Sequence, residues 1–475
     1  MKRLPFILLA LITIWLRLVN LGYSDYQGDE IKALYLPTPG QTFSSYLLDQ
    51  RKGPFQFVVT AALKVFTPDY TDRFLVRLPF ALAGILAVFF FYRLCKKHFG
   101  SKIAFFAAFF FATNGFFVAF SRLVQYQSFV ILFMILALYL FSLVKTKFIY
   151  FGFLAWAISM LFHYDGAFIF PFAAYLMIKT KKFKHILLAG GLAAILLGIF
   201  YIPFVTTLSP ATLAYWRGRL AGGSTKISSS KYLFSVYQPI YALKIYFILG
   251  ALGVVSWFKK IDRTKLALLA WILFPSALLE TLVNIPGTHI YTYLVPSFVV
   301  VGYGVALIEK LKPRLLILAG IATVFLFIFL QSNTIYVEHK LEYPWEDEKF
   351  LIWTLPKPSS VYHLSLFGFP YNRNWDGIRN HIIAENKSQN YSSNERKSIT
   401  RYYIKSARAN EQDFYYVYII FPQSFEDRIN NARAFNWAKR NKPIKHFYVD
   451  GRLVSYLYLI PATFETNGVV LPDQD

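Results

Sequence analysis

Acidic residues concentrate in one stretch near the start of the chain, residues 23–30, which reads Tyr-Ser-Asp-Tyr-Gln-Gly-Asp-Glu. It places Asp25, Asp29 and Glu30 within six positions, whereas only ten of the 26 acidic residues precede residue 332. A partly desolvated carboxylate can act as a general base toward an acceptor hydroxyl or amine, and an adjacent one can bind a metal or shift its partner's pKa. Helix capping is the alternative interpretation. Asp29 and Glu30 are therefore candidate catalytic residues, and Glu30 is also a candidate metal ligand.

Two polar segments could bind a phosphate. Arg51 and Lys52 precede a Gly-Pro pair, and Arg122 stands close to Gln125 and Tyr126. A cation in such a loop can hold a phosphate whose lipid tail enters the bilayer. The alternatives are an ordinary solvated charge for Arg51 and Lys52 and, for Arg122, a side chain that reaches the lipid headgroups.

Two further segments carry ionisable side chains. His163 and Asp165 lie between two unusually short apolar stretches, a pattern typical of a recessed cavity, and ionisable groups at such positions are usually functional. Asp165 is thus a third candidate catalytic residue, whereas we expect His163 to be a packing residue rather than a metal ligand. His289 precedes Tyr293 by four residues, so on a helix the two would share a face and could clamp a phosphate. An aromatic belt explains the tyrosine equally well.

Composition places these residues in a membrane protein. The 475 residues are 56% hydrophobic and only 16% charged, and apolar stretches of membrane-spanning length recur along the chain. The formal charge of +24 does not indicate a nucleic-acid partner, because the basic residues cluster at alternate ends of the apolar stretches. One cysteine excludes a disulfide framework within the chain and a multi-cysteine metal site.

About 11 membrane-spanning helices are predicted, the first being an uncleaved signal anchor. Lysine and arginine mark every second loop, which predicts a cytoplasmic N-terminus and an outer location for residues 23–72 and for everything after the last span. The predicted spans are residues 4–21, 77–94, 103–120, 128–144, 148–162, 167–178, 186–205, 240–258, 266–283, 290–308 and 315–330.

Two regions outside the spans have structure of their own. In the first outer loop, residues 42–49 and 55–66 are predicted to form short helices on the membrane surface. After the membrane domain, residues 1–331, residues 332–475 are predicted to form a small extracytoplasmic α/β domain. Its predicted strands are residues 361–367, 414–421 and 453–460, its helix is residues 425–440, and residues 386–398 are predicted to be a surface loop.

The chain resembles the GT-C membrane glycosyltransferases, specifically those related to protein O-mannosyltransferases and the lipid A aminoarabinose transferase. The resemblance covers most of the membrane part and little of the outer domain. Its motifs are Arg17-Leu-Val-Asn-Leu, Gly28-Asp29-Glu30, Lys52-Gly-Pro54, the run Arg-Leu-Pro-Phe-Ala-Leu-Ala-Gly at residues 77–84, Phe99-Gly100, residues 117–122 and Tyr293-Leu-Val-Pro296.

This resemblance implies a sugar carried on a polyprenyl phosphate and transferred outside the cytoplasmic membrane to a protein, a lipid or an envelope glycan. It implies that Asp29 is the base or acceptor-orienting carboxylate and that Lys52 contacts the donor phosphate, with His289 and Tyr293 as helpers. The His-Tyr-Asp-Gly segment departs from the Lys-Gly pair of many relatives, which leaves the role of Asp165 open. We expect a single inverting displacement that needs no cofactor, with a divalent cation as an option through Glu30.

Two other classes of function fit a chain with many spans. A transporter or lipid flippase usually shows internal repeats and ionisable groups near the middle of the bilayer, whereas here those groups crowd the outer boundary. In a non-catalytic envelope assembly protein the outer domain would act and the spans would only anchor it. The enzyme is the interpretation that uses the acidic stretch.

Overall fold

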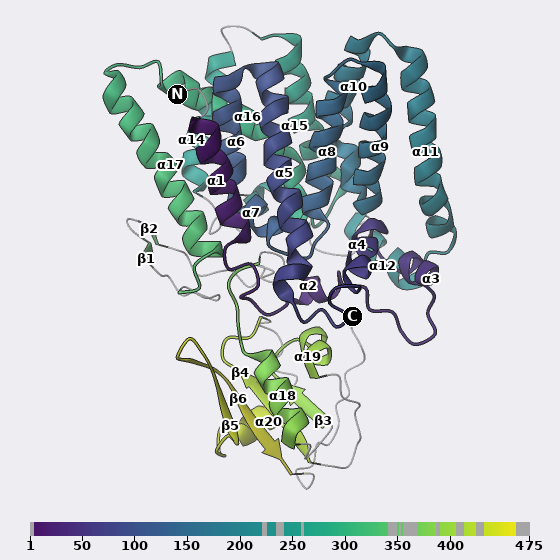
Figure 1. Cartoon of the computed structure of the whole chain (residues 1–475), viewed down its shortest axis with the longest axis vertical. Helices are drawn as coiled ribbons and strands as arrows, with labels where there is room; N and C mark the ends of the chain where they lie inside the picture. Colours follow the sequence, from purple (N-terminus) through teal and green to yellow (C-terminus); the bar gives the residue numbers. More distant parts are fainter. Residues whose placement is uncertain are drawn as a thin grey trace.

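The computed structural model describes residues 4–220, 226–233, 242–257, 261–340, 349–350, 353–354, 368–385, 390–404, 413–423 and 432–461. Most of them form a bundle of helices that run roughly along one axis, with a smaller sheet-containing part at one end (Figure 1). The long helices of the bundle are α1 (Leu4–Leu18), α5 (Arg73–Phe99), α6 (Ser101–Thr113), α8 (Gln127–Phe141), α9 (Thr146–Phe162), α10 (Phe170–Thr180), α11 (Phe183–Thr206), α14 (Leu243–Trp257), α15 (Arg263–Leu282), α16 (Tyr291–Ile308) and α17 (Arg314–Tyr336).

Five helical segments in the described part of the chain are long and apolar enough to cross a membrane. They are α5, α11, α15, α16 with the turn before it, and α17; a sixth is formed if α6 and α7 (Gly115–Ser121), which are bent by 61°, count as one span. The chain is therefore a multi-pass membrane protein. Each of the eleven predicted segments coincides with a helix or with this bent pair. The helices at the other five segments are shorter, so it stays a prediction that these five also cross the membrane.

Polar residues at the ends of the apolar runs set where several helices begin. The carboxylate of Asp72 accepts a hydrogen bond from the backbone of Leu75 at the start of α5, and Asp262 caps α15 in the same way. Asn114 ends α6, and its side chain accepts from the backbone of Phe116 at the start of α7. The break between α6 and α7 therefore follows from an Asn that caps a new helix inside an apolar run.

Small residues let the central helices approach closely. A Cβ on Gly304 of α16 would lie 1.9 Å from the Leu249 carbonyl oxygen of α14, and one on Gly253 of α14 would lie 2.0 Å from the Val300 carbonyl oxygen. Without a hydrophobic driving force between helices inside lipid, such close packing is a main source of their association. This packed centre is a rigid base for the segments at the end of the bundle.

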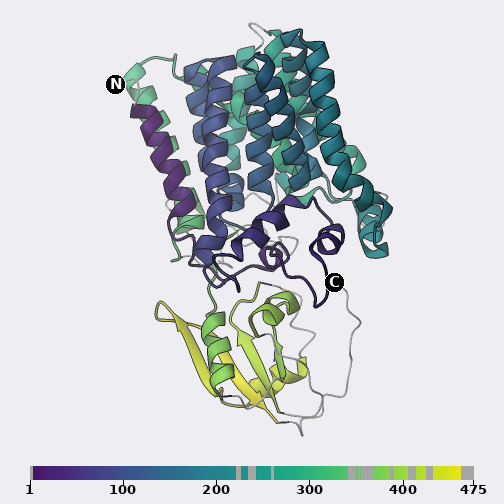
Figure 2. The same ribbon diagram turned by 45° about the vertical axis from the view of Figure 1, so that its right-hand side comes forward.

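The candidate site residues lie at the end of the bundle nearer the sheet. The segments there are α2 (Gly28–Ile31), α3 (Phe43–Leu48), α4 (Phe55–Leu63), α12 (Pro210–Leu220) and the turns η1 (Tyr164–Ile169) and η4 (Gly287–Ile290) (Figures 1 and 2). Helices α3 and α4 confirm that residues 42–49 and 55–66 are mainly helical.

The C-terminal part contains a four-stranded sheet in the order β3-β4-β6-β5. Strand β3 (Asn390–Ser393) pairs parallel with β4 (Phe414–Ile419), and β6 (Arg452–Ile460) pairs antiparallel with both β4 and β5 (Lys445–Val449). Helices α18 (Trp375–Glu385), α19 (Lys397–Ile404) and α20 (Ala432–Ala438) accompany the sheet, and the short β1 (Lys349–Phe350) and β2 (Trp353–Thr354) pair separately.

Strands β4 and β6 confirm two of the predicted strands, and α20 falls within the predicted helix. The predicted strand 361–367 lies outside the described residues. The prediction of a surface loop over residues 386–398 is wrong where β3 forms: Tyr391 and Ser392 pair with β4 despite the Ser/Asn-rich composition, because a neighbouring strand supplies their hydrogen bonds.

The C-terminal part packs directly on the acidic stretch. The backbone of Arg373 donates to Asp25 Oδ2 over 2.6 Å, and Arg73 forms ion pairs with both Asp25 and Asp376. The backbone N–H of Tyr26 donates a hydrogen bond to the Tyr403 hydroxyl oxygen over 2.8 Å. Asp25 is thus a docking residue between the first loop and the C-terminal part.

Candidate active site

Asp29 lies on α2, half-buried, and its carboxylate has no hydrogen-bond or ion-pair partner among the residues that the structure describes. Its backbone carbonyl accepts a hydrogen bond from Gln125 Nε2 over 2.7 Å. A carboxylate that is held in place through its own backbone, with both oxygens free, can accept a proton from an incoming group.

Glu30, the next residue, is placed quite differently. It is fully buried, and its two oxygens accept hydrogen bonds from Nε and Nη2 of Arg77, both over 2.8 Å. They also accept from the backbone N–H groups of Gln27 and Val124. Because four donors occupy this carboxylate, it has little capacity left for a metal or a substrate, and we assign Glu30 a structural role.

Arg77 completes this arrangement. Its remaining donors bond to the carbonyl oxygens of Leu21, Ser24 and Asp25, so the guanidinium group gathers the acidic stretch around itself. A buried ion pair whose hydrogen bonds are all made fixes geometry well, although its net contribution to stability is modest. The pair Glu30–Arg77 therefore holds α2, and with it Asp29, in position.

Lys52 is the cation that a shared glutamine connects to Asp29. Its ammonium group donates to Gln125 Oε1 over 3.4 Å, so one glutamine touches both Lys52 and the Asp29 backbone. Burial lowers the pKa of Lys52 to about 8, against the opposing effect of the Asp29 carboxylate, and Lys32 lowers it further. A half-buried cation that has no carboxylate in direct contact among the described residues is well prepared to receive an anion.

Close backbone packing brings Lys52 to the end of α9. A Cβ on Gly53 would lie 2.0 Å from the Leu161 carbonyl oxygen, so only glycine fits here. The ammonium group of Lys52 lies 4.9 Å from the centre of the Tyr126 ring, and that ring stacks on His163 with centroids 4.2 Å apart. The loop that carries Lys52 is thereby connected to the second group of ionisable residues.

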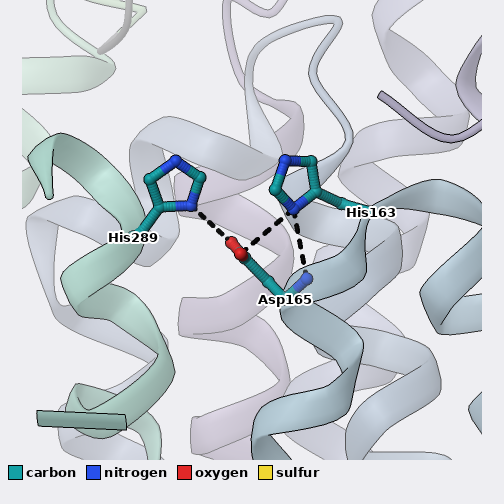
Figure 3. A group of neighbouring side chains, drawn as sticks. All are labelled: His163, Asp165 and His289. Carbon is teal, nitrogen blue, oxygen red and sulfur yellow. Dashed lines mark hydrogen bonds and ion pairs between the residues drawn. The ribbon is translucent and has the colours of Figure 1, made fainter. Parts of the chain in front are cut away.

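That second group consists of His163, Asp165 and His289 (Figure 3). Asp165 is fully buried; its Oδ1 lies 3.1 Å from His163 Nδ1, and its Oδ2 lies 2.7 Å from His289 Nδ1. The Tyr291 hydroxyl donates to Oδ2 over 2.8 Å. Burial acts to raise the pKa of Asp165, but the His163 and His289 imidazoles outweigh it and hold the pKa below its usual range. The oxygens of Asp165 thus face His163, His289 and Tyr291, which favours an organising role over proton transfer.

The remaining predicted phosphate ligands divide into two kinds. Arg51 is exposed and lies over the Tyr215 ring at 4.7 Å, near the site but free to move. Arg122 is buried and donates to the carbonyl oxygens of Leu16, Val19 and Asn20, so it caps the C-terminal end of α1. These bonds give Arg122 a structural role in place of the two roles that the sequence suggested, binding the donor phosphate or reaching the lipid headgroups.

The expected pairing of His289 with Tyr293 is not what the structure shows. His289 lies in the four-residue 3₁₀ turn η4, and the tyrosine that reaches its partner Asp165 is Tyr291. A 3₁₀ turn has about three residues per turn, which shifts the face by comparison with an α-helix. Tyr293 is directed instead toward Ser229 and Glu280.

Sequence reasoning missed three aromatic and basic neighbours. Tyr291 gave no signal beyond that of an aromatic belt, and His163 was expected to be a packing residue. Arg219 lies over the Tyr215 ring at 5.0 Å, the same ring that Arg51 covers. Arg219 falls in a predicted outer loop where the membrane orientation does not call for basic residues, which was the signal that could have found it.

The geometry can now be compared with known proteins. Residues 55–205 match the family described as dolichyl-phosphate-mannose-protein mannosyltransferase. The crystal structure of ArnT from Cupriavidus metallidurans bound to undecaprenyl phosphate is similar over 95% of this chain and 97% of that one, with a TM-score of 0.58 and 11% identity. This chain has the GT-C fold.

Two further solved structures are similar to this chain. The apo state of the same ArnT has a TM-score of 0.55 with 11% identity over 95% of this chain and 97% of that one. The Archaeoglobus fulgidus oligosaccharyltransferase in complex with Zn and sulfate is less similar, with a TM-score of 0.47 and 14% identity over 95% of this chain and 72% of that one. No curated protein matches the sequence. At these identities the structural likeness shows the fold alone.

Proposed function

We propose that the chain is a glycosyltransferase that moves a sugar from a polyprenyl-phosphate donor to an acceptor on the outer face of the cytoplasmic membrane. One observation carries the proposal: the half-buried Asp29 carboxylate, free of partners among the described residues, is connected through Gln125 to the half-buried cation Lys52. The fold supports it, since ArnT shares that fold and has been solved with undecaprenyl phosphate bound. The match of residues 55–205 to the dolichyl-phosphate-mannose-protein mannosyltransferases points to the same class of donor.

In this mechanism Asp29 accepts the proton of the acceptor hydroxyl or amine as the acceptor attacks the anomeric carbon. The bond between that carbon and the phosphate oxygen breaks, and the polyprenyl phosphate leaves with both bonding electrons, so the configuration at the anomeric carbon inverts. Lys52 stabilises the charge that develops on the leaving phosphate, and general-base and electrostatic terms together lower the barrier. The exposed Arg51 precedes Lys52 in the same loop and assists it in binding the phosphate, whereas Arg122 and Glu30 act only by holding the segments in place.

The acceptor is a protein, a lipid or a glycan at the outer surface. A small cleft of about 10 Å³ lies between the first loop and the C-terminal part, with Tyr26, Arg73, Asp376, Tyr402 and Tyr403 among its lining residues. None of the proposed catalytic residues lines it. At this volume it holds about one water molecule, so the proposal places no part of the acceptor there.

The test is to incubate the purified chain with a panel of polyprenyl-phosphate sugars and candidate acceptors and to measure released lipid phosphate together with glycosylated product. We expect both to form with one donor and to be absent without acceptor. Proteoliposomes provide the arm for the transporter alternative. Movement of the donor across the bilayer with no glycosyl product from any donor would contradict the proposal.

A further inference from the structure

We propose that His163, Asp165 and His289 form a binding site for a transition-metal ion of the Zn²⁺ class. One ligand atom of each residue lies within 4.8 Å of the others, and no other such group of three occurs in the part of the chain that the structure describes. The three residues come from two elements far apart in the sequence, the α9–η1 junction and η4 (Figure 3). This site goes beyond the proposed function, and it differs from the Glu30 ligand that the sequence suggested.

The ligand atoms of His163 and Asp165 already lie side by side. His163 Nδ1 lies 3.1 Å from Asp165 Oδ1 and 3.2 Å from the backbone nitrogen of Asp165. An imidazole nitrogen has one lone pair, so a proton or a metal ion on Nδ1 satisfies Oδ1, whereas a free lone pair there satisfies only the backbone N–H. A metal ion would replace that proton and keep a positive charge next to Oδ1.

The surroundings hold the ligands in place. The Tyr126 ring stacks flat on the His163 imidazole, with 8° between the two planes, and the Tyr291 hydroxyl donates to Asp165 Oδ2. Hydrogen-bonded neighbours of this kind orient ligands and are usual around metal sites. Gly166 contributes as well, because a Cβ there would lie 2.7 Å from Ser159 Oγ, so only glycine lets η1 turn this tightly after α9.

The donor set selects the class of metal. Two imidazoles and one carboxylate suit Zn²⁺ and its first-row neighbours, whereas Mg²⁺ and Ca²⁺ prefer oxygen ligands. Three protein ligands leave a further coordination position open, as in sites that also bind water or a substrate oxygen. If the proposed function holds, this site neighbours the proposed phosphate ligand, because the Tyr126 ring stacks on His163 and its centre lies 4.9 Å from the Lys52 ammonium group.

The experiment titrates Co²⁺ into the full-length chain in detergent after treatment with a chelator and follows the visible d–d absorption of bound Co²⁺. We expect one Co²⁺ per chain, displaced by Zn²⁺ and not by excess Mg²⁺. H163Q and H289Q should each weaken binding by roughly tenfold or more, and Y291F by roughly tenfold, as for a residue that orients a ligand. The matched control is H446Q, the same change at an exposed histidine of β5, which should bind as the unchanged chain does.

X-ray absorption of the Co²⁺-loaded unchanged chain keeps the proposal testable if the variants fold poorly, because two imidazole ligands should be visible there. The proposal is overturned if the unchanged chain binds no stoichiometric Co²⁺, if Mg²⁺ displaces it, or if H289Q binds as H446Q does. None of these readouts depends on glycosyl transfer, so their failure is separate from failure of the proposed function.

Discussion

Among single residues, Lys52 is the one whose surroundings bear most directly on the proposed chemistry. Its ammonium group contacts Gln125 and Tyr126 and has no carboxylate in direct contact among the residues that the structure describes. Burial lowers its pKa to about 8; the Asp29 carboxylate opposes this shift and Lys32 adds to it. The charge needed to bind a phosphate is therefore fully present below that pH and is lost above it.

Donor affinity should fall as the pH rises through about 8. Once Lys52 is mostly neutral, the apparent KM for the donor should rise by about tenfold per pH unit. The Lys52→Arg variant should flatten this dependence, because a guanidinium group stays charged. The measurement is the donor KM against pH for both proteins. A KM that rises equally in the Lys52→Arg variant would show that another group titrates.

At the scale of elements, the loop that carries Lys52 depends on its contact with α9. Gly53 lies against the Leu161 carbonyl oxygen with no room for a methyl group. On the other side of the site, the buried pair Glu30–Arg77 ties α2 to α5 and to the segment before α8. These two contacts, neither of them at a reacting atom, set the distance between the proposed base and the proposed phosphate ligand.

The Gly53→Ala variant should lose both stability and donor affinity. Overpacking of this kind costs about 1–3 kcal/mol, and the loop can relieve it only by moving Lys52 away from Gln125. Thermal unfolding and the donor KM are the two measurements. Gly191→Ala on α11, where an added methyl group meets nothing within 4 Å, is the control; it should lower neither stability nor donor affinity. A donor KM that is unchanged in Gly53→Ala would contradict the positioning role.

The Glu30→Ala variant should unfold much more easily than the unchanged chain. Removing one partner leaves the Arg77 charge buried and unpaired, which costs about 3–5 kcal/mol. The matched control is Glu309→Ala, which breaks the ion pair with the half-exposed Lys102 and should cost less than about 1 kcal/mol. Equal losses in the free energy of unfolding for the two variants would show that the Glu30–Arg77 pair does not organise α2.

At the scale of the whole molecule, the C-terminal part is docked on the first loop rather than tethered beyond it. Asp25 accepts the backbone N–H of Arg373 and pairs with Arg73, and its own backbone donates to the Tyr371 carbonyl oxygen. The same loop carries Asp29 four residues later. A few hydrogen bonds thus connect the C-terminal part to the loop that carries the proposed base.

The Asp25→Ala variant should loosen the C-terminal part. The buried backbone N–H of Arg373 loses its acceptor and Arg73 loses its less exposed partner, which together should cost about 1–3 kcal/mol. Asp376→Ala removes only the exposed partner of Arg73 and should cost less than about 1 kcal/mol. Limited proteolysis and thermal unfolding compare the two. Faster cleavage of Asp376→Ala than of Asp25→Ala would contradict this docking.

The sequence predicted a large part of this arrangement. Apolar runs and basic loops placed every bundle helix, because burial in lipid leaves a strong local signal, and the acidic stretch led to Asp29. It could not distinguish Asp29 from Glu30, since that difference depends on Arg77, 47 positions after Glu30. In the same way, the cap that Arg122 makes on α1 and the position of His163 beside Asp165 and His289 depend on contacts between distant segments. Such pairings have no local pattern from which to predict them.

The most direct test of the account compares the Asp29→Asn variant with the unchanged chain at saturating donor and acceptor. Loss of a general base should lower the turnover rate by about 10²- to 10⁴-fold and leave donor affinity largely intact. The matched control, Asp49→Asn, changes an exposed aspartate of the same loop and should keep the full rate. Transfer by Asp29→Asn at the rate of Asp49→Asn would contradict the central claim that Asp29 is the base.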